Sequence, residues 1–122
     1  MKVNNKGVQI NYELSGKEDA PAVLLSHSLA SSMIMWQPQL KMLEDSYRVI
    51  RYDMRGHGNS DAPEGPYTLE ILVDDVVALL NELKIDKIHF VGLTIGGMIG
   101  QGFAIKHQHR LLSLVQIGRA HV

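Results

Sequence analysis

The sequence predicts an α/β fold in which a mostly parallel β-sheet carries helices on both faces, behind an antiparallel N-terminal hairpin. Two observations lead to this prediction. From residue 22 onward, short apolar runs alternate with helical periodicity, and residues 2–16 contain two short alternating runs around a turn-rich cluster. Strands joined through helices pair in parallel by right-handed crossovers. With 122 residues, the chain has the length of one domain.

The strand predictions rest on apolar runs bounded by turn residues. The cluster Asn4-Asn5-Lys6-Gly7 separates the two N-terminal runs and predicts the hairpin turn. Residues 22–26, after Pro21, form a continuous apolar run, as expected of a strand buried on both faces. Further strands are predicted at 47–52, 87–93 and 111–117.

The clearest helix prediction begins after Thr68, whose side chain can cap the first turn. Asp86 ends this helix, and the neighbouring acids Asp74 and Asp75 are expected on its solvated face, because consecutive side chains of a helix point apart. The apolar residues of the helix recur at three- and four-residue steps: Leu69, Leu72, Val73, Val76, Val77, Leu80 and Leu83. Less regular helices are predicted at 35–45 and 95–108.

Composition excludes several classes of function. The chain is 45% hydrophobic and 20% charged, with a net charge of -1 and no block of Lys or Arg, so a nucleic-acid partner is not expected. There is no cysteine, and no His/Asp/Glu cluster has the spacing of metal ligands, so no metal site is predicted. No apolar run approaches 18 residues and no signal-peptide pattern begins the chain, which predicts a cytoplasmic protein with no membrane association.

The stretch Val91-Gly92-Leu93-Thr94-Ile95-Gly96-Gly97 has the pattern of a strand-to-helix turn that presents a nucleophile. A predicted strand precedes it, a predicted helix follows it, and the glycines leave room for the sharp turn. Thr94 would occupy the nucleophile position. The backbone N–H of Ile95, at the start of the helix, would point to a developing oxyanion. The alternative is a turn residue whose hydroxyl only hydrogen-bonds the backbone.

Two more loops leave the carboxyl ends of predicted parallel strands, where ligands bind in such sheets. In the first, the N–H of Leu29 is the candidate second oxyanion donor and Ser28 shapes the loop. His27 is expected to be a loop histidine with satisfied hydrogen bonds. Trp36 can either line a substrate pocket or pack the loop. The second loop, residues 53–66, is rich in glycine and charge and is expected to be scaffolding near the site.

These motifs resemble the N-terminal half of the α/β-hydrolases, and most closely the 3-oxoadipate enol-lactonases, over residues 3–115. The resemblance runs through LLSHSLASSMIMWQPQ, RYDMRGHGNSDAPEGPYT and GGMIGQ, and the Ser28-Leu29 pair favours the lactonase branch. It implies hydrolysis of a small-molecule ester or lactone in aromatic-compound catabolism (the β-ketoadipate pathway), by nucleophilic attack on the carbonyl without a cofactor. Alternatives are another hydrolase of this fold, either an esterase or a haloperoxidase-like enzyme, or a non-catalytic protein.

The sequence departs from this family in two ways. The nucleophile position holds Thr94 instead of serine, and no Asp or Glu follows it to serve as the triad acid. His107 and His109 follow, but at about 1.5 Å per helical residue they lie about 20 Å from Thr94. The chain alone is therefore expected to be inactive.

We also expect the chain to be truncated before the lid and the last strands of the family fold. Residues 1–115 would then be a partial hydrolase domain whose last strand has an open apolar edge. Residues 116–122 would be a non-native tail, because IGRAHV resembles one translated frame of a sequencing adapter. Resequencing the source gene beyond codon 115 tests this expectation. The oligomeric state stays open.

Overall fold

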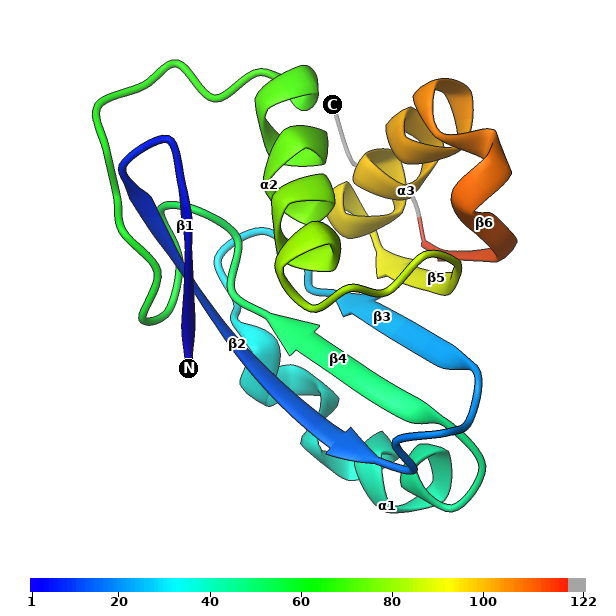
Figure 1. The fold of residues 1–122 in the computed structure, drawn as a ribbon. Helices are drawn as coiled ribbons and strands as arrows, with labels where there is room; N and C mark the ends of the chain where they lie inside the picture. Colours follow the sequence, from blue (N-terminus) through cyan, green and yellow to red (C-terminus); the bar gives the residue numbers. More distant parts are fainter. Residues whose placement is uncertain (119–122) are drawn as a thin grey trace.

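The computed structural model describes residues 1–118 and contains one six-stranded sheet with three α-helices and two short 3₁₀ helices (Figure 1). In chain order the elements are β1 (Lys2–Asn5), β2 (Val8–Gly16), β3 (Ala22–Ser26), η1 (Met33–Trp36), α1 (Gln37–Glu44), β4 (Arg48–Tyr52), α2 (Leu69–Glu82), β5 (Ile88–Leu93), α3 (Ile95–Lys106), η2 (Gln108–Arg110) and β6 (Leu111–Ile117).

The strand order across the sheet is β1-β2-β4-β3-β5-β6. β1 pairs with β2 and β2 with β4 in antiparallel fashion, while β4, β3, β5 and β6 run parallel to one another. This arrangement confirms the predicted fold class: a mostly parallel sheet behind an antiparallel hairpin. The carboxyl ends of β3, β4 and β5 consequently lie at one edge of the sheet, where the predicted site loops begin.

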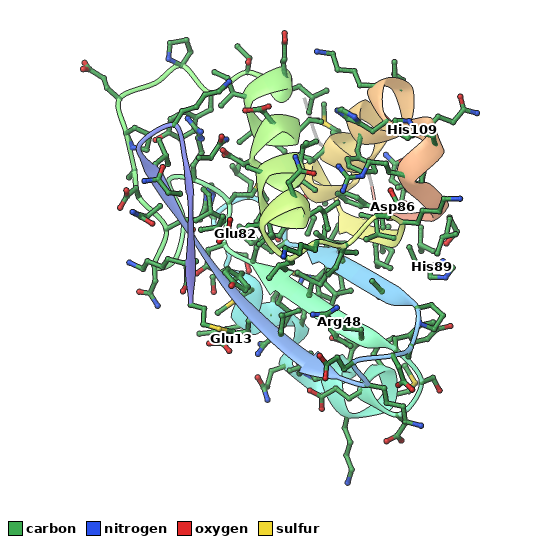
Figure 2. All side chains as sticks on the ribbon, in the orientation of Figure 1. Glu13, Arg48, Glu82, Asp86, His89 and His109 are labelled. Atoms are coloured by element: carbon green, nitrogen blue, oxygen red, sulfur yellow. The ribbon has the colours of Figure 1, made fainter. Side chains whose placement is uncertain are left out.

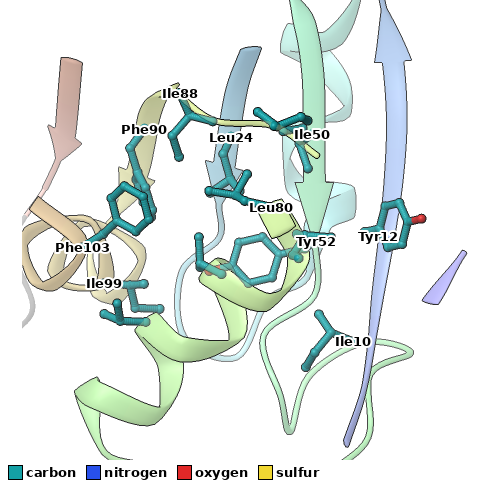
Figure 3. Close-up of a cluster of buried hydrophobic side chains, with 14 of the residues drawn as sticks. Ile10, Tyr12, Leu24, Ile50, Tyr52, Leu80, Ile88, Phe90, Ile99 and Phe103 are labelled. Carbon is teal, nitrogen blue, oxygen red and sulfur yellow. The ribbon is translucent and has the colours of Figure 1, made fainter. Parts of the chain in front are cut away.

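Helices cover both faces of the sheet, with α1 on one side and α2 and α3 on the other (Figure 1). Alternation along β3 divides its residues between two cores, because successive side chains of a strand point to opposite faces. Leu24 packs on the α2/α3 side with Phe90 and Phe103 (Figure 3), whereas Val23 and Leu25 pack on the α1 side. The continuous apolar run at 22–26 is thus explained by burial on both faces.

Helix α2 begins where the sequence predicts, since Oγ1 of Thr68 accepts the N–H of Ile71 at 3.2 Å. The predicted helix at 35–45 is instead a 3₁₀ turn followed by the shorter α1. In the 3₁₀ turn, Met33 and Trp36 are three residues apart and both are buried, a spacing that matches a helix of three residues per turn. The predicted helix at 95–108 ends earlier, because His107 leaves helical geometry at φ -130° and ψ 42°.

Strand β6 includes Gln116 and Ile117, two residues beyond the sequence-based boundary at 115. The rest of the expected tail, residues 119–122, lies outside the described residues. Within residues 1–118, no helix combines the length and apolar character needed to cross a membrane.

Candidate active site

Thr94 forms the turn between β5 and α3 with a backbone conformation that few L-residues adopt, at φ 52° and ψ -109°. Such a conformation costs about 1–3 kcal/mol and persists only where surrounding contacts impose it. Here the N–H of Thr94 donates to the carbonyl of Ile117 at 2.9 Å, and the N–H of Met98 donates to the carbonyl of Thr94 at 3.1 Å. The turn is therefore held from both sides, with the side chain of Thr94 half-buried.

The hydroxyl of Thr94 does not cap α3, and no described residue forms a hydrogen bond with it. A turn residue retained only for a backbone hydrogen bond would use that hydroxyl. The strained backbone and the unoccupied hydroxyl are the geometry of a side chain presented at a strand-to-helix elbow.

Two glycines allow this turn to approach its neighbours closely. A Cβ at Gly92 would overlap the backbone of Gly96, and a Cβ at Gly96 would overlap the carbonyl of Ser26 and lie 2.8 Å from the carbonyl oxygen of His27. The first turn of α3 thus packs directly on the end of β3 and the start of the loop that follows it. This contact brings the loop with Ser28 and Leu29 to the turn with Thr94.

The two predicted oxyanion donors are both available. Ile95 is the first residue of α3, so its N–H has no partner within the helix. Leu29 lies in the loop after β3 and is 66% exposed. Neither N–H donates to an acceptor within residues 1–118. Free backbone N–H groups at a helix N-terminus and a neighbouring loop can stabilise negative charge on a substrate oxygen.

The loop of residues 53–66 supports the loop after β3. The carboxylate of Asp53 is buried and accepts N–H groups from Met33 at 2.8 Å and Asn59 at 3.0 Å, and the side-chain amide of Asn11 at 3.0 Å. Gly58 passes so close to this carboxylate that a Cβ would overlap it. Asp53 therefore ties together the two loops and β2, which confirms the expectation that this loop is scaffolding.

His27 is fully buried, and both of its ring nitrogens contact backbone groups. Nε2 accepts the N–H of Met54 at 2.9 Å, and Nδ1 lies 2.8 Å from the carbonyl oxygen of Ser28. Burial lowers the pKa of His27. The expectation of a satisfied loop histidine is confirmed, since a ring with both nitrogens engaged has none free to take a proton from Thr94.

Ser28 and Trp36 were the two candidate substrate-binding residues. Ser28 is half-buried, and its N–H and hydroxyl face the sulfur of Met35 at 3.4 and 3.8 Å. Trp36 is buried on the α1 side of the sheet, against Val23 and Leu40. This placement matches the packing alternative for Trp36, and a substrate role for either residue stays a prediction.

Asp75 corrects the expectation of a solvated acidic pair on α2. Its carboxylate is buried and accepts two hydrogen bonds from Arg55 and one from Asn5, all at 2.7 Å. Only Asp74 is partly solvated, and it lies 3.6 Å from the ammonium of Lys6. The signal was present in the sequence, because Asp75 falls between Leu72 and Leu79 on the apolar face of the helix.

Catalytic partners for Thr94 are absent from the described part of the chain. His107 follows α3 and His109 lies in η2, beyond the opposite end of the helix (Figure 2). Residues 1–118 also contain no group of three His, Asp or Glu side chains that could hold a metal ion. A groove of about 370 Å³ lies beside the C-terminal end of α3, between Lys6, Glu70 and Lys106. It is therefore separate from Thr94.

A mostly parallel sheet with a strained strand-to-helix turn after its fifth strand is typical of the α/β hydrolases. The chain belongs to this family: residues 21–121 match the family model for the alpha/beta hydrolase fold.

Individual relatives include lactone-cleaving enzymes. 3-Oxoadipate enol-lactonase 2 of Acinetobacter baylyi is 43% identical over 108 residues, which are 88% of this chain and 40% of that protein. The crystal structure of the enol-lactonase from Burkholderia xenovorans LB400 aligns with a TM-score of 0.89 at 42% identity, over 91% of this chain and 44% of that one. A structure described as an N-acyl homoserine lactone degrading enzyme aligns with a TM-score of 0.93 at 34% identity, over 98% and 45% of the two chains. The chain therefore spans about two fifths of the length of these relatives.

Proposed function

We propose that this chain supplies the nucleophile and the oxyanion hole of a carboxylic ester or lactone hydrolase, specifically a 3-oxoadipate enol-lactonase. The observation that carries the proposal is the backbone of Thr94, which holds a strained conformation at the strand-to-helix turn with its hydroxyl unoccupied. The similarity to enol-lactonases supports the choice of substrate class.

In the proposed reaction, Oγ1 of Thr94 attacks the carbonyl carbon of the substrate and gives up its proton to a base. The N–H groups of Leu29 and Ile95 stabilise the resulting oxyanion. Collapse of the tetrahedral intermediate breaks the ring C–O bond of the lactone, and the base returns the proton to the departing enolate oxygen. The ester left on Thr94 is then hydrolysed by water, which gives the carboxylic acid and restores the hydroxyl of Thr94. No cofactor takes part. Ser28 would shape the loop after β3 that carries the Leu29 N–H. Trp36 is the other candidate for substrate contact, but it packs on the α1 side of the sheet.

The isolated chain is expected to be inactive. Threonine is a weak nucleophile until a neighbouring base activates it, and His27 has both ring nitrogens engaged. The rival proposal is a non-catalytic protein of this fold. It is favoured by the β-branched side chain at Thr94, because the methyl group crowds the line of attack.

A chimera tests the proposal. Residues 1–117 would be joined to the remaining C-terminal part of the Acinetobacter baylyi enol-lactonase, and hydrolysis of the enol-lactone and of p-nitrophenyl acetate would be measured. We expect turnover that Thr94→Ser preserves or raises and that Thr94→Ala lowers at least ~10³-fold. A Thr94→Ala chimera as active as its parent would show that Thr94 is not the nucleophile. A second control, Thr68→Ala, changes a threonine of the α2 cap and should leave turnover unchanged.

A further inference from the structure

Two histidines connect the loops that follow β3 and β4 through hydrogen bonds. His27, in the first loop, accepts the N–H of Met54 at 2.9 Å. His57, in the second loop, accepts the N–H of Ala30 at 3.3 Å. The ring centroids lie 5.2 Å apart. Each loop therefore supplies the acceptor for a backbone donor of the other.

The hydrogen bonds indicate which ring nitrogen of each neutral imidazole carries the proton. An Nε2 that accepts a hydrogen bond carries no proton, so the proton of the neutral ring lies on Nδ1. Consistent with this, Nδ1 of His27 is 2.8 Å from the carbonyl oxygen of Ser28, and Nδ1 of His57 is 3.2 Å from that of Arg55. A second proton on either ring would set an N–H against a backbone N–H and break the link.

The residue that His57 holds is adjacent to the proposed oxyanion donor. Ala30 has a φ of 58°, a left-handed conformation that is unfavourable for an alanine. Leu29 precedes it and makes no backbone hydrogen bond of its own. The direction of the Leu29 N–H therefore depends on how Ala30 is held, and the bond to His57 is the one that fixes the N–H of Ala30.

The surroundings of His27 favour its neutral form. Burial is the main cause that lowers the pKa of His27, and the neighbouring His57 acts in the same direction, whereas the carboxylate of Asp53 opposes them. Tyr52 faces His27 with its aromatic ring, and the two ring centroids are 6.5 Å apart. The guanidinium of Arg55 is turned to Asp75.

We propose that His27 and His57 are positioning residues, which form a reciprocal clamp between the two loops and fix the Leu29 N–H in the oxyanion hole. The functional consequence rests on the proposed hydrolase activity. The clamp itself is a property of the folded chain and can be measured without catalysis.

The first test uses the chain with ¹⁵N-labelled histidine at low concentration. Long-range ¹H–¹⁵N correlations at pH 7.5 should show His27 and His57 as neutral Nδ1–H tautomers, and an Nε2–H tautomer at either residue would overturn the clamp. Amide hydrogen exchange gives a second readout. On lowering the pH from 7.5 to 5.5, the protection factor of the Ala30 N–H should fall at least about tenfold, and by more than that of Leu24 in β3, which follows the global stability of the fold. An unchanged Ala30 would also overturn the proposal.

Two substitutions separate positioning from general packing. His57→Phe keeps a ring but removes the acceptor, and His57→Gln keeps an acceptor at the position of Nε2. We expect exchange of the Ala30 N–H to increase about tenfold or more in His57→Phe and to return close to the parent value in His57→Gln. Equal exchange in the two variants would contradict the clamp.

In the chimera described above, His57→Phe should lower kcat at least about tenfold with little change in KM, and His57→Gln should restore most of it. If the chimera were inactive while amide exchange and the histidine tautomers still showed an intact clamp, the result would count against the proposed function alone. An active chimera with equal kcat in both variants would count against the positioning role alone.

Discussion

The guanidinium of Arg55 donates two hydrogen bonds of 2.7 Å to the carboxylate of Asp75 and thereby fastens the loop after β4 to helix α2. The two side chains are 12% and 2% exposed, so the pair is shielded from water. Hydrogen bonding to Asp75 is the main cause that raises the pKa of Arg55. Because the same loop carries Asp53 and His57, this ion pair supports the residues that hold the loop after β3.

Replacement of Asp75 should destabilise the fold. Asp75→Ala leaves the guanidinium of Arg55 largely buried without its counter-ion, which should lower the free energy of unfolding by about 3 kcal/mol. Asp74→Ala is the matched control, since Asp74 precedes Asp75 in the same helix but loses only its contact with the exposed ammonium of Lys6 and one 3.2 Å hydrogen bond from Asn5. It should change stability by less than about 0.5 kcal/mol. Urea denaturation measures the unfolding free energy of both variants. Equal losses in the two would show that the ion pair between Arg55 and Asp75 does not contribute more to stability than the surface contacts of Asp74.

Gly96 should tolerate no side chain. Gly96→Ala forces a methyl group into the carbonyl groups of Ser26 and His27, and rigid backbone cannot retreat as a side chain can. We expect a loss of about 3 kcal/mol or more in unfolding free energy. Gly102→Ala in the same helix meets only side chains of α2, among them Val73 at 2.8 Å, and should cost less. Thermal unfolding would compare them, and a Gly96→Ala protein as stable as the parent would disprove the close contact.

Stability should fall at mildly acidic pH through His27. Its folded-state pKa is lowered below the ordinary 6.5, so the unfolded chain binds more protons between these values. The stabilising contribution is therefore complete above pH 6.5 and is lost as the pH falls through the folded-state pKa, with a slope of at most about 1.4 kcal/mol per pH unit.

His27→Gln should remove that part of the pH dependence. Urea denaturation at pH 7.5, 6.5 and 5.5 gives the slope for each protein. His107→Gln is the comparison, because burial also lowers the pKa of His107. Since His107 is only half-buried, its replacement should reduce the pH dependence of the unfolding free energy less than His27→Gln does. Parallel curves for the parent and His27→Gln would be evidence against a buried neutral His27.

Strand β6 should make the chain self-associate. Within residues 1–118 it pairs with β5 alone, and Val115 on it is 47% exposed. An apolar edge strand with free backbone groups is a template for pairing with other chains. Sedimentation at several concentrations should show species larger than the 13.6 kDa monomer, and Val115→Lys should reduce them.

Ile105→Lys provides the control for this effect. Ile105 is an exposed apolar residue as well, at 84%, but it belongs to helix α3 and not to a strand. The Ile105→Lys substitution should leave self-association unchanged. If both lysine variants dissolved the larger species to the same extent, general hydrophobicity and not the edge of β6 would be responsible.

The sequence alone determined the elements and the position of the candidate nucleophile. The apolar run at 22–26, the three- and four-residue steps after Thr68 and the glycines around Thr94 are local patterns, because strand and helix periods act within a few residues. The approach of Gly96 to the end of β3 belongs to the tertiary structure, since Ser26 and His27 are distant from it along the chain, although a glycine is needed there because a Cβ would not fit. The 3₁₀ turn before α1 was missed because its residues three apart resemble one turn of an α-helix.

The tertiary structure decided which polar groups meet. Asp75 and Arg55 are 20 residues apart, and His57 and Ala30 are 27 apart. No periodicity links residues at such separations. Their pairing depends on the strand order, in which β4 lies between β2 and β3, and so places the loops after β3 and β4 side by side. A buried carboxylate or imidazole must then find its partner among whatever groups the sheet brings near, because leaving it unpaired would cost more than the fold can offset.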